Sequence, residues 1–347
     1  MDDAGTAQGS VQGSVRVHAP ARLHFGFLDL HGGLGRRYGS LGLALDAPAV
    51  VIEAAPAATL AVTGGAAPGI AAELPRVRAA AEAAAGALGV PATGSFHLED
   101  TVPAHAGFGS GTQIALATAA ALARLHGVAF RPDAFAGALE RGNRSGVGLA
   151  AFTGGGFLVD GGRDESGAPP PIVARLDYPE AWRVVLLLDP ARTGVHGAEE
   201  RHAFGALPRF PAEGAAEICR LVLMQVLPAL ATADPDRFGH GIGAIQRRIG
   251  DYFAPYQGGR YASTAVAAAL AAIEALGIPG HGQSSWGPTG FALVGSQAEA
   301  EALVARLRPR HPGLDLVIAR GRNRGASVDG GPYPARESST AAGSGGL

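Results

Sequence analysis

The chain has 347 residues, of which 47% are hydrophobic and 17% charged, and this composition excludes an intrinsically disordered protein. A formal net charge of -2 argues against nucleic acid as a partner, because proteins that bind nucleic acid carry an excess of basic side chains. The single cysteine, Cys219, excludes disulfides within the chain and cysteine-based zinc sites, and we interpret it as a core residue.

The basic residues are all arginine, since the sequence contains no lysine. Any anion held by a side-chain cation is therefore held by a guanidinium, which suits bidentate contacts to phosphate or carboxylate, and a lysine Schiff base is excluded. The N-terminus is polar, and we find no apolar run of the roughly 18 residues that a membrane span needs. We therefore expect a cytoplasmic protein with no membrane contact.

The first half of the chain predicts short strands followed by alternating helices and strands. Residues 1–14 are typical of a disordered leader. Alternating apolar residues predict strands at 15–18, 22–28, 41–45, 50–53 and 60–62, and then a helix over 74–88. A strand over 94–101, helices over 114–126 and 132–141, and a strand over 156–160 follow.

The second half opens with an apolar run at 183–189 that is typical of a central strand. Helical patterns follow near 197–204, 213–231, 235–249 and 261–276, and then a strand at 291–295, a helix at 297–307 and a strand at 314–319. Residues 327–347 are typical of a disordered tail. The alternation supports an α/β or α+β protein with two domains, 15–180 and 181–326.

A glycine-rich loop, Pro-Ala-His-Ala-Gly-Phe-Gly-Ser-Gly-Thr-Gln at 103–113, joins a predicted strand to a predicted helix. Gly107, Gly109 and Gly111 let the backbone approach a ligand closely, while Ser110 and Thr112 add hydroxyls beside the positive end of the helix dipole. The pattern predicts a site for phosphate or pyrophosphate; a tight turn with a capped helix is the alternative. The spacing matches neither the P-loop nor the dinucleotide-binding fingerprint.

Three segments in order resemble the motifs of the GHMP kinase superfamily. They are Pro-Ala-Arg-Leu-His-Phe-Gly-Phe-Leu-Asp-Leu-His-Gly at 20–32, the loop at 103–113, and Ser-Ser-Trp-Gly-Pro-Thr-Gly at 284–290. The resemblance implies an α+β GHMP kinase fold, with an N-terminal domain like ribosomal protein S5, a C-terminal ferredoxin-like domain, and a ligand cleft between them.

One branch of that superfamily matches more closely. The chain resembles the β-ribofuranosylaminobenzene 5'-phosphate synthases in these three segments and in the stretch from Arg141 to Gly162. The resemblance covers nearly all of 15–326. It implies a decarboxylating phosphoribosyltransferase of tetrahydromethanopterin biosynthesis, which joins 4-aminobenzoate or 4-hydroxybenzoate to phosphoribosyl pyrophosphate with Mg²⁺ as cofactor.

Two other functions stay open. Many superfamily kinases carry a catalytic aspartate two positions after a Ser-Gly pair, where this chain has Gly148 after Ser145 and Gly146. This departure weakens the first alternative, an ATP-dependent small-molecule kinase. The second is a catalytically silent protein that binds phosphoribosyl pyrophosphate and regulates a partner.

The reaction implied by the resemblance needs cations for phosphate and carboxylate, and we assign these to Arg22 and Arg144, with His24 and His105 as further catalytic candidates. His24 follows Arg22 by two residues and is expected on the same face of a strand. The phosphate-binding candidates are Gly107, Gly109, Ser110, Gly111, Thr112 and Gln113. The substrate-binding candidates are Ser145, Ser285, Trp286 and Thr289.

Magnesium usually takes one or two protein carboxylates besides substrate phosphates, so no spacing rule identifies its ligands. The candidates are Asp29, Asp160, Glu199 and Glu200. Helix capping or an ordinary surface charge explains each of them equally well. The apolar helices of the second half could form a homodimer interface or belong to the core.

Overall fold

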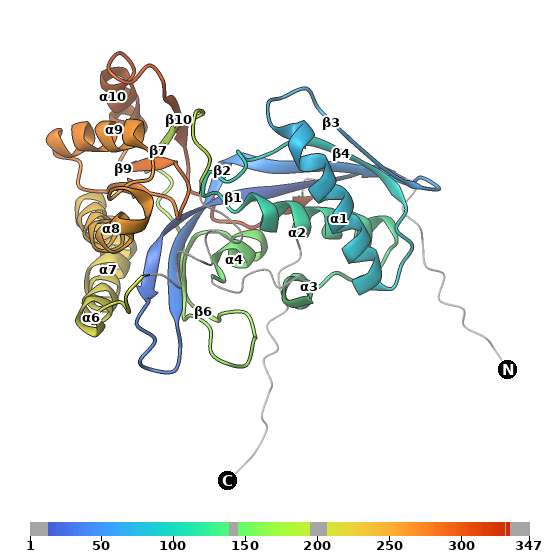
Figure 1. Ribbon diagram of the computed structural model, residues 1–347. Coiled ribbons are helices and arrows are strands. Elements are labelled where there is room, and N and C mark those ends of the chain that lie inside the picture. The colour runs from blue at the N-terminus through green and yellow to red at the C-terminus, as the bar shows by residue number, and fades with distance from the viewer. Residues whose placement is uncertain (1–12, 139–144, 195–206, 330, 334–347) are drawn as a thin grey trace, which may run out of the picture.

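The computed structural model describes residues 13–138, 145–194, 207–329 and 331–333, and these form two β-sheets with helices packed against them (Figure 1). The larger sheet has the order β12-β11-β1-β2-β4-β3, with β5 and β6 joined to it through β2. The smaller sheet has the order β10-β7-β9-β8. The chain passes from the larger to the smaller between β6 and β7, and the segment after β10 returns to the larger.

Two long antiparallel strands, β1 (Val15–Asp29) and β2 (Tyr38–Ala55), lie at the centre of the larger sheet. The sequence predicted two short strands in place of each, and that division was wrong. β1 continues through Pro20 because its register with β2 shifts between Pro20 and Arg22. A proline lacks the N–H that a regular ladder needs, and an irregularity of this kind accommodates it.

Helices cover one face of the larger sheet, with α1 and α2 packed side by side (Figure 1). The remaining elements of this half are β3 (Leu60–Gly64), α1 (Ile70–Leu88), β4 (Gly94–Asp100), α2 (Ser110–Leu125), α3 (Pro132–Ala138), α4 (Val147–Thr153), β5 (Phe157–Asp160) and β6 (Ile172–Leu176). Helix α2 begins four residues before the predicted start, inside the glycine-rich loop, because Gly109 supplies the left-handed residue that precedes it.

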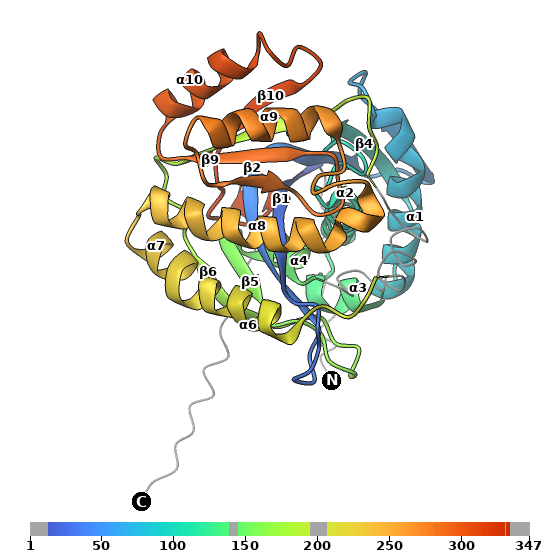
Figure 2. The ribbon, with the colours of Figure 1, turned by 60° about the vertical axis from the view of Figure 1, so that its left-hand side comes forward.

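The smaller sheet has a ferredoxin-like strand order, as the resemblance implied: its first strand in the chain, β7, lies between β10 and β9. Helices α8 and α9 lie across it (Figure 2). The elements are β7 (Arg183–Leu188), α6 (Ala212–Leu221), the π-helical turn η1 (Val222–Val226), α7 (Leu227–Ala231), α8 (Pro235–Gln257), α9 (Thr264–Ala275), β8 (His281–Gln283), β9 (Gly290–Val294), α10 (Gln297–Leu307) and β10 (Asp315–Ala319). The helix predicted near 197–204 lies outside the described residues.

A single core joins the two sheets, since buried side chains of β1, β7, α8 and β9 belong to one apolar cluster. Helix α8 crosses β1 at Gly26, where a Cβ atom would lie 3.3 Å from the Ile245 side chain. This close crossing brings α8 beside the first motif, and it fixes the position of the site described below.

Two predictions about the periphery were wrong. Residues 327 to 333 were assigned to a disordered tail, yet β11 (Ser327–Val328) pairs with β1 and with β12 (Gly331–Pro332). Cys219 was assigned to the core, yet its side chain is exposed on α6. Both errors arose from local composition, which does not report which partner a segment meets in the fold.

The run of helix from Ala212 to Ala231 is long and apolar enough to cross a membrane by length and composition, with a mean hydropathy of 1.5 over 18 residues. The expectation that no run reaches this length was therefore wrong. One such helix is weak support for a membrane span, because core helices of soluble proteins pass the same test. Of these 18 residues 33% are buried, and Leu223 and Met224 are exposed.

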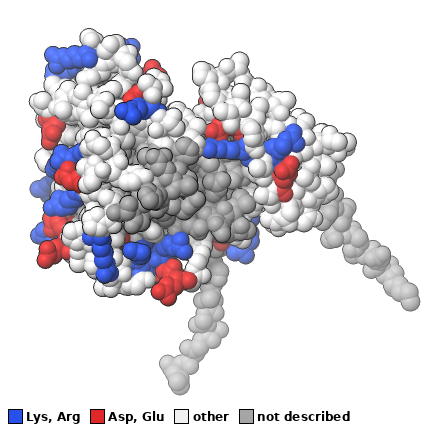
Figure 3. Space-filling model, in the orientation of Figure 1, with Lys and Arg blue, Asp and Glu red and all other residues white. Residues whose placement is uncertain are grey.

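Acidic and basic side chains of the described residues are interspersed over the face shown in Figure 3. On this face they gather into no large patch of one sign among the residues that the structure describes.

Candidate active site

Strand β1 carries Arg22 and His24 and places both beside glycine-rich loops. The Arg22 backbone N–H donates to the carbonyl of Phe108 at 3.2 Å, and Nη1 of its guanidinium donates to the carbonyl of Gly107 at 2.5 Å. The backbone N–H of His24 donates to Oγ of Ser284 at 3.0 Å. The first motif therefore contacts the second through Arg22 and the third through His24.

The second motif is a tight turn that ends at the start of α2. Gly107 and Gly109 have φ values of 89° and 78°, which non-glycine residues rarely adopt. A Cβ at Gly107 would overlap the carbonyl oxygen of Ser284. The Gly109 carbonyl accepts the N–H groups of Thr112 and Gln113 at 3.1 and 3.3 Å, which closes the first turn of the helix.

The N–H groups of Ser110 and Gly111 have no backbone acceptor among the described residues. They lie at the N-terminus of a 16-residue helix, where the dipole favours negative charge. The Ser110 hydroxyl is 7% exposed and adds a further donor. Such an arrangement of backbone and hydroxyl donors is able to bind a phosphate group, and phosphate binding at this loop stays a prediction.

The third motif contacts the second motif at the Gly107 carbonyl, which also accepts from Arg22. The Ser284 hydroxyl donates to this carbonyl at 2.7 Å. A Cβ at Gly287 would overlap the backbone of Ala106, so the two loops meet at backbone contact distance. All three motifs, far apart in the sequence, thus converge on one carbonyl oxygen.

The predicted substrate-binding residues of the third motif divide into two groups. Ser285 and Trp286 line a pocket, and the Trp286 ring lies 4.3 Å from the ring of Phe253. Thr289 is 1% exposed, and its carbonyl accepts the N–H of Ser284 at 2.9 Å. The Thr289 backbone therefore supports the loop, and a contact between its side chain and the substrate stays a prediction.

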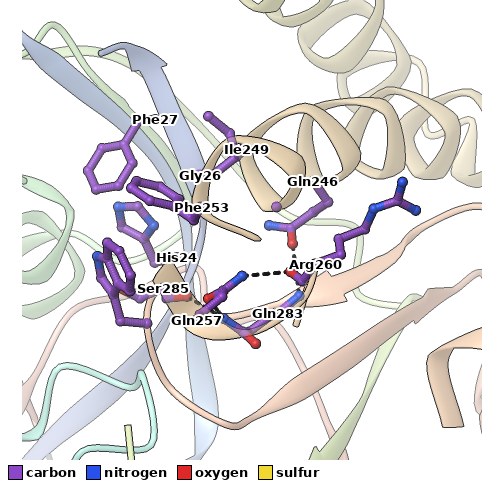
Figure 4. A pocket seen from close by; sticks show the side chains of 12 residues that line it. His24, Gly26, Phe27, Gln246, Ile249, Phe253, Gln257, Arg260, Gln283 and Ser285 are labelled. Carbon is purple, nitrogen blue, oxygen red and sulfur yellow. Dashed lines mark hydrogen bonds between the residues drawn. The ribbon is translucent and has the colours of Figure 1, made fainter. Parts of the chain in front are cut away.

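The pocket lies between β1, the third motif and the last turns of α8 (Figure 4). Its walls combine aromatic rings with amide groups and are formed by His24, Gly26, Phe27, Gln246, Ile249, Gly250, Phe253, Gln257, Arg260, Gln283, Ser285 and Trp286. Its volume is about 30 Å³, room for one or two water molecules, whereas a cavity of about 150 Å³ binds benzene. An aromatic ring can therefore enter only after wall residues move.

Sequence reasoning missed the α8 wall of this pocket. Gln246 donates to the carbonyl of Phe25 at 2.6 Å and accepts the N–H of Gln283 at 2.8 Å, so it joins the first motif to the third. Gln257 follows Gln246 by three helical turns and faces the same pocket. Polar residues at this spacing within an amphipathic helix were the available signal.

Residues 75–156 match the family model of the GHMP kinases N terminal domain. The chain is 32% identical over 329 residues to the β-ribofuranosylphenol 5'-phosphate synthase of Archaeoglobus fulgidus, covering 91% of this chain and 99% of that protein. It is 30% identical over 326 residues to the Methanothermobacter thermautotrophicus protein of the same name, covering 89% and 97%. The chain belongs to the β-ribofuranosylphenol 5'-phosphate synthase family.

Solved structures confirm the GHMP fold of this synthase family member. Leishmania major mevalonate kinase in complex with R-mevalonate superposes with a TM-score of 0.65 at 16% identity, covering 88% of this chain and 95% of the kinase. Homoserine kinase from Cytophaga hutchinsonii gives 0.61 at 19% identity, covering 92% and 98%. At such identities the likeness concerns the fold alone.

Ser145, a predicted substrate-binding residue, and Asp160, a predicted metal ligand, are hydrogen-bonded to each other at the start of α4. Asp160 is completely buried, and its carboxylate accepts the N–H groups of Gly146 and Gly162, each at 2.9 Å, and the Ser145 hydroxyl at 3.3 Å. Burial raises the pKa of Asp160, while these hydrogen bonds act in the opposite direction. In this structure the Asp160 carboxylate therefore serves as a buried anchor, and its assignment as a metal ligand stays a prediction.

Asp29, a further metal-ligand candidate, is the last residue of β1 and lies in a turn. Its Oδ1 accepts the N–H groups of His31 and Gly32 at 2.7 and 2.8 Å and so closes the turn between β1 and β2. Along β1 it lies seven residues beyond Arg22, roughly 23 Å at about 3.3 Å per residue. Among the residues that the structure describes, no three His, Cys, Asp or Glu side chains form a group that could hold a metal ion.

The remaining candidates have separate positions. The Gln113 side chain donates to the Gly148 carbonyl at 2.8 Å and so ties α2 to α4, while its predicted phosphate contact stays a prediction. His105 lies in the second motif, with Nε2 2.9 Å from Nη2 of Arg76. Arg144, Glu199 and Glu200 lie outside the described residues.

Proposed function

We propose that this protein is a decarboxylating phosphoribosyltransferase, which joins an aromatic acid to phosphoribosyl pyrophosphate and releases CO₂ and pyrophosphate. The observation that carries the proposal is the convergence of three motifs on the Gly107 carbonyl, between an anion-binding helix terminus and a pocket with aromatic walls. A substrate that carries phosphate groups and a substrate that carries an aromatic ring would meet beside this carbonyl. The names of the related proteins, which describe a ribosyl phenol phosphate, support the same reaction class.

The phosphate groups of phosphoribosyl pyrophosphate would bind the N–H groups of Ser110 and Gly111 and the adjoining hydroxyls. Departure of pyrophosphate leaves positive charge on the sugar ring and places negative charge on the leaving group. Donors that are already aligned at the helix terminus stabilise that charge without reorganising. The Arg22 guanidinium, held against Gly107, adds a fixed positive charge at the same place.

The aromatic acid would bind in the pocket between β1 and α8, with Trp286 and Phe253 against its ring. The ring carbon that bears the carboxylate attacks the sugar carbon as the bond to pyrophosphate breaks. The bond to the carboxylate then breaks, its electron pair restores aromaticity, and CO₂ leaves. The para amino or hydroxyl group supplies electron density to the attacking carbon, so the reaction needs no separate electron sink.

Magnesium is the cofactor that this chemistry calls for, because it offsets charge on the leaving pyrophosphate. The described residues fit an ion that arrives with the substrate phosphates: the second motif offers hydroxyl oxygens from Ser110 and Thr112, and hydroxyls of such loops can ligate magnesium. We therefore infer that the substrate supplies most of the ligands, and that Asp29 and Asp160 supply none.

The acceptor is 4-hydroxybenzoate or 4-aminobenzoate, and the phenol in the relatives' names favours the hydroxy acid. The product would enter tetrahydromethanopterin biosynthesis in the cytoplasm. Gly148 argues against a kinase. A Cβ atom at Gly148 would lie 3.5 Å from the Thr112 side chain of the second motif. An aspartate at this position could therefore reach the glycine-rich loop, whereas glycine supplies no base.

Release of labelled CO₂ from the carboxyl-labelled acids tests the proposal. We expect release that requires phosphoribosyl pyrophosphate and Mg²⁺ and falls at least 100-fold in Arg22→Ala. Arg78→Ala, which alters an exposed arginine of α1, is the control. Folded protein that releases no CO₂ from either acid, and that consumes ATP with a small alcohol, would replace the proposal with a kinase.

A further inference from the structure

We propose that Arg76 is a second phosphate-binding cation of this site, held in place by the buried carboxylate of Glu73. The inference rests on the proposed function and assigns to Arg76 the outer phosphate of the bound pyrophosphate group. Neither residue belongs to the three motifs, and both lie on α1.

Glu73 is the observation from which the inference starts. Its side chain is only 2% exposed, yet it carries a carboxylate, and burying a carboxylate costs free energy unless it is paired. Both of its oxygens lie 3.1 Å from Nη1 of Arg76, one helical turn further along α1. A buried carboxylate whose two oxygens contact one nitrogen restricts the directions in which that guanidinium can point.

The other end of the guanidinium reaches the second motif. Nη2 of Arg76 lies 2.9 Å from Nε2 of His105, and because a guanidinium can only donate, Nε2 of His105 is the acceptor. His105 itself has a φ of 54°, so its left-handed backbone turns the ring toward α1.

Two arginines therefore approach the phosphate loop from different elements. Arg22 reaches it from β1 at Gly107, and Arg76 reaches it from α1 at His105, two residues earlier. The Arg76 side chain is 37% exposed, and its five N–H donors exceed the two groups that it contacts among the described residues. A ligand with two linked phosphates, which is longer than the helix terminus alone can satisfy, would use both cations.

A purely structural ion pair is the competing explanation, and binding of inorganic pyrophosphate separates the two. We would measure its affinity by calorimetry with Mg²⁺ for the wild type, Arg76→Ala and Arg78→Ala. Arg78 is the matched control, because it lies on the same helix, is exposed, and donates to the Leu60 carbonyl at 3.4 Å, away from the loop. Because Arg76→Ala loses charge-assisted hydrogen bonds, we expect it to bind pyrophosphate about 10- to 100-fold more weakly than the wild type. We expect Arg78→Ala to bind pyrophosphate as tightly as the wild type.

Glu73→Gln tests the positioning role of the carboxylate, because glutamine keeps the size and one acceptor oxygen. We expect a several-fold increase in KM for phosphoribosyl pyrophosphate, with kcat and KM for the aromatic acid unchanged. Thermal unfolding of each variant shows whether the fold survives. Folded Arg76→Ala that binds pyrophosphate as tightly as the wild type would overturn the inference, even where CO₂ release supports the proposed function. A wild type that neither binds pyrophosphate nor releases CO₂ would overturn both.

Discussion

One carbonyl oxygen, that of Gly107, accepts hydrogen bonds from the first and third motifs at once. Ser284 has a further contact, because its hydroxyl oxygen also accepts the backbone N–H of His24. A single buried hydroxyl thus connects the strand with the phosphate loop. Residues of this kind set the geometry of a site without touching its substrate.

We expect Ser284→Ala to destabilise the protein by about 1–3 kcal/mol, because it leaves the buried N–H of His24 without its acceptor. Denaturant unfolding measures this change, and CO₂ release is expected to fall with it as the loops separate. Ser285→Ala is the control for stability, since the bonds found for Ser285 use its backbone. Equal stability of the two variants would contradict the role given to Ser284.

The buried His281 and the half-buried His18 predict a pH dependence of stability. Burial lowers the pKa of His281 below the ordinary 6.5, and burial followed by the charge of Arg322 lowers the pKa of His18. The folded state then binds fewer protons than the unfolded state. Stability is fully present above pH 6.5 and is lost as the pH falls through the folded pKa, at up to about 1.4 kcal/mol per pH unit for each group.

Replacing His281 tests this dependence. His281 donates from Nδ1 to the Ile278 carbonyl at 2.8 Å, a bond that the amide of asparagine can imitate. We expect His281→Asn to flatten the decline of the unfolding free energy between pH 7 and pH 5. His240→Asn is the control, because the exposed His240 makes the same 2.8 Å bond to the Asp236 carbonyl. An unchanged slope in His281→Asn would refute the assignment.

At the scale of elements, a buried carboxylate defines the start of α4. Asp160, the last residue of β5, accepts the N–H of Gly146, and Gly146 is the residue that precedes the helix. The helix is only seven residues long and needs such a tertiary anchor, because isolated short helices are unstable in water. Its position in turn fixes Gly148 beside α2.

We expect Asp160→Asn to cost about 1–3 kcal/mol of stability, because an asparagine NH₂ group faces one of the backbone N–H groups that the carboxylate now accepts. The Mg²⁺ concentration that gives half-maximal CO₂ release is expected to stay at the wild-type value. Denaturant unfolding and a magnesium titration measure the two quantities. A large shift in the magnesium requirement would restore Asp160 as a metal ligand.

The sequence predicted the elements better than their connections. Helix 297–307 matches α10 because Ser296 caps it and its apolar face is regular. Strand β1 was predicted in two pieces, since Pro20 is a local signal for a break while the bulge that accommodates it depends on the partner strand. The glycine-rich loop at 103–113 was recognisable from its composition and its place between a strand and a helix. Gln246, Phe253 and Arg76 were not, because only the packing of α8 and α1 brings them to the loops.

At the scale of the whole molecule, the helical run 212–231 presents an apolar face to solvent. Leu223 is 65% and Met224 69% exposed, and both lie in the π-helical turn η1. Neighbouring exposed apolar side chains of this size favour a protein contact. We expect the protein to form a homodimer through this face.

The double variant Leu223→Glu, Met224→Glu tests that expectation. Both side chains are exposed, so the unfolding free energy of the monomer is expected to stay within about 0.5 kcal/mol. Sedimentation is expected to give a dimer mass for the wild type and a monomer mass for the variant. A wild type that is monomeric at micromolar concentration would remove the helix from consideration as an interface.

The pairing of β11 with β1 determines when the larger sheet can be completed during synthesis. Arg16 and Asp329 are hydrogen-bonded although they stand 313 positions apart, and Val17 lies opposite Val328. Strand β1 therefore keeps an open hydrogen-bonding edge until β11, about 300 positions later in the chain, has been synthesised. Open strand edges recruit other chains, so the nascent protein is most exposed to aggregation before β11 emerges and pairs with β1.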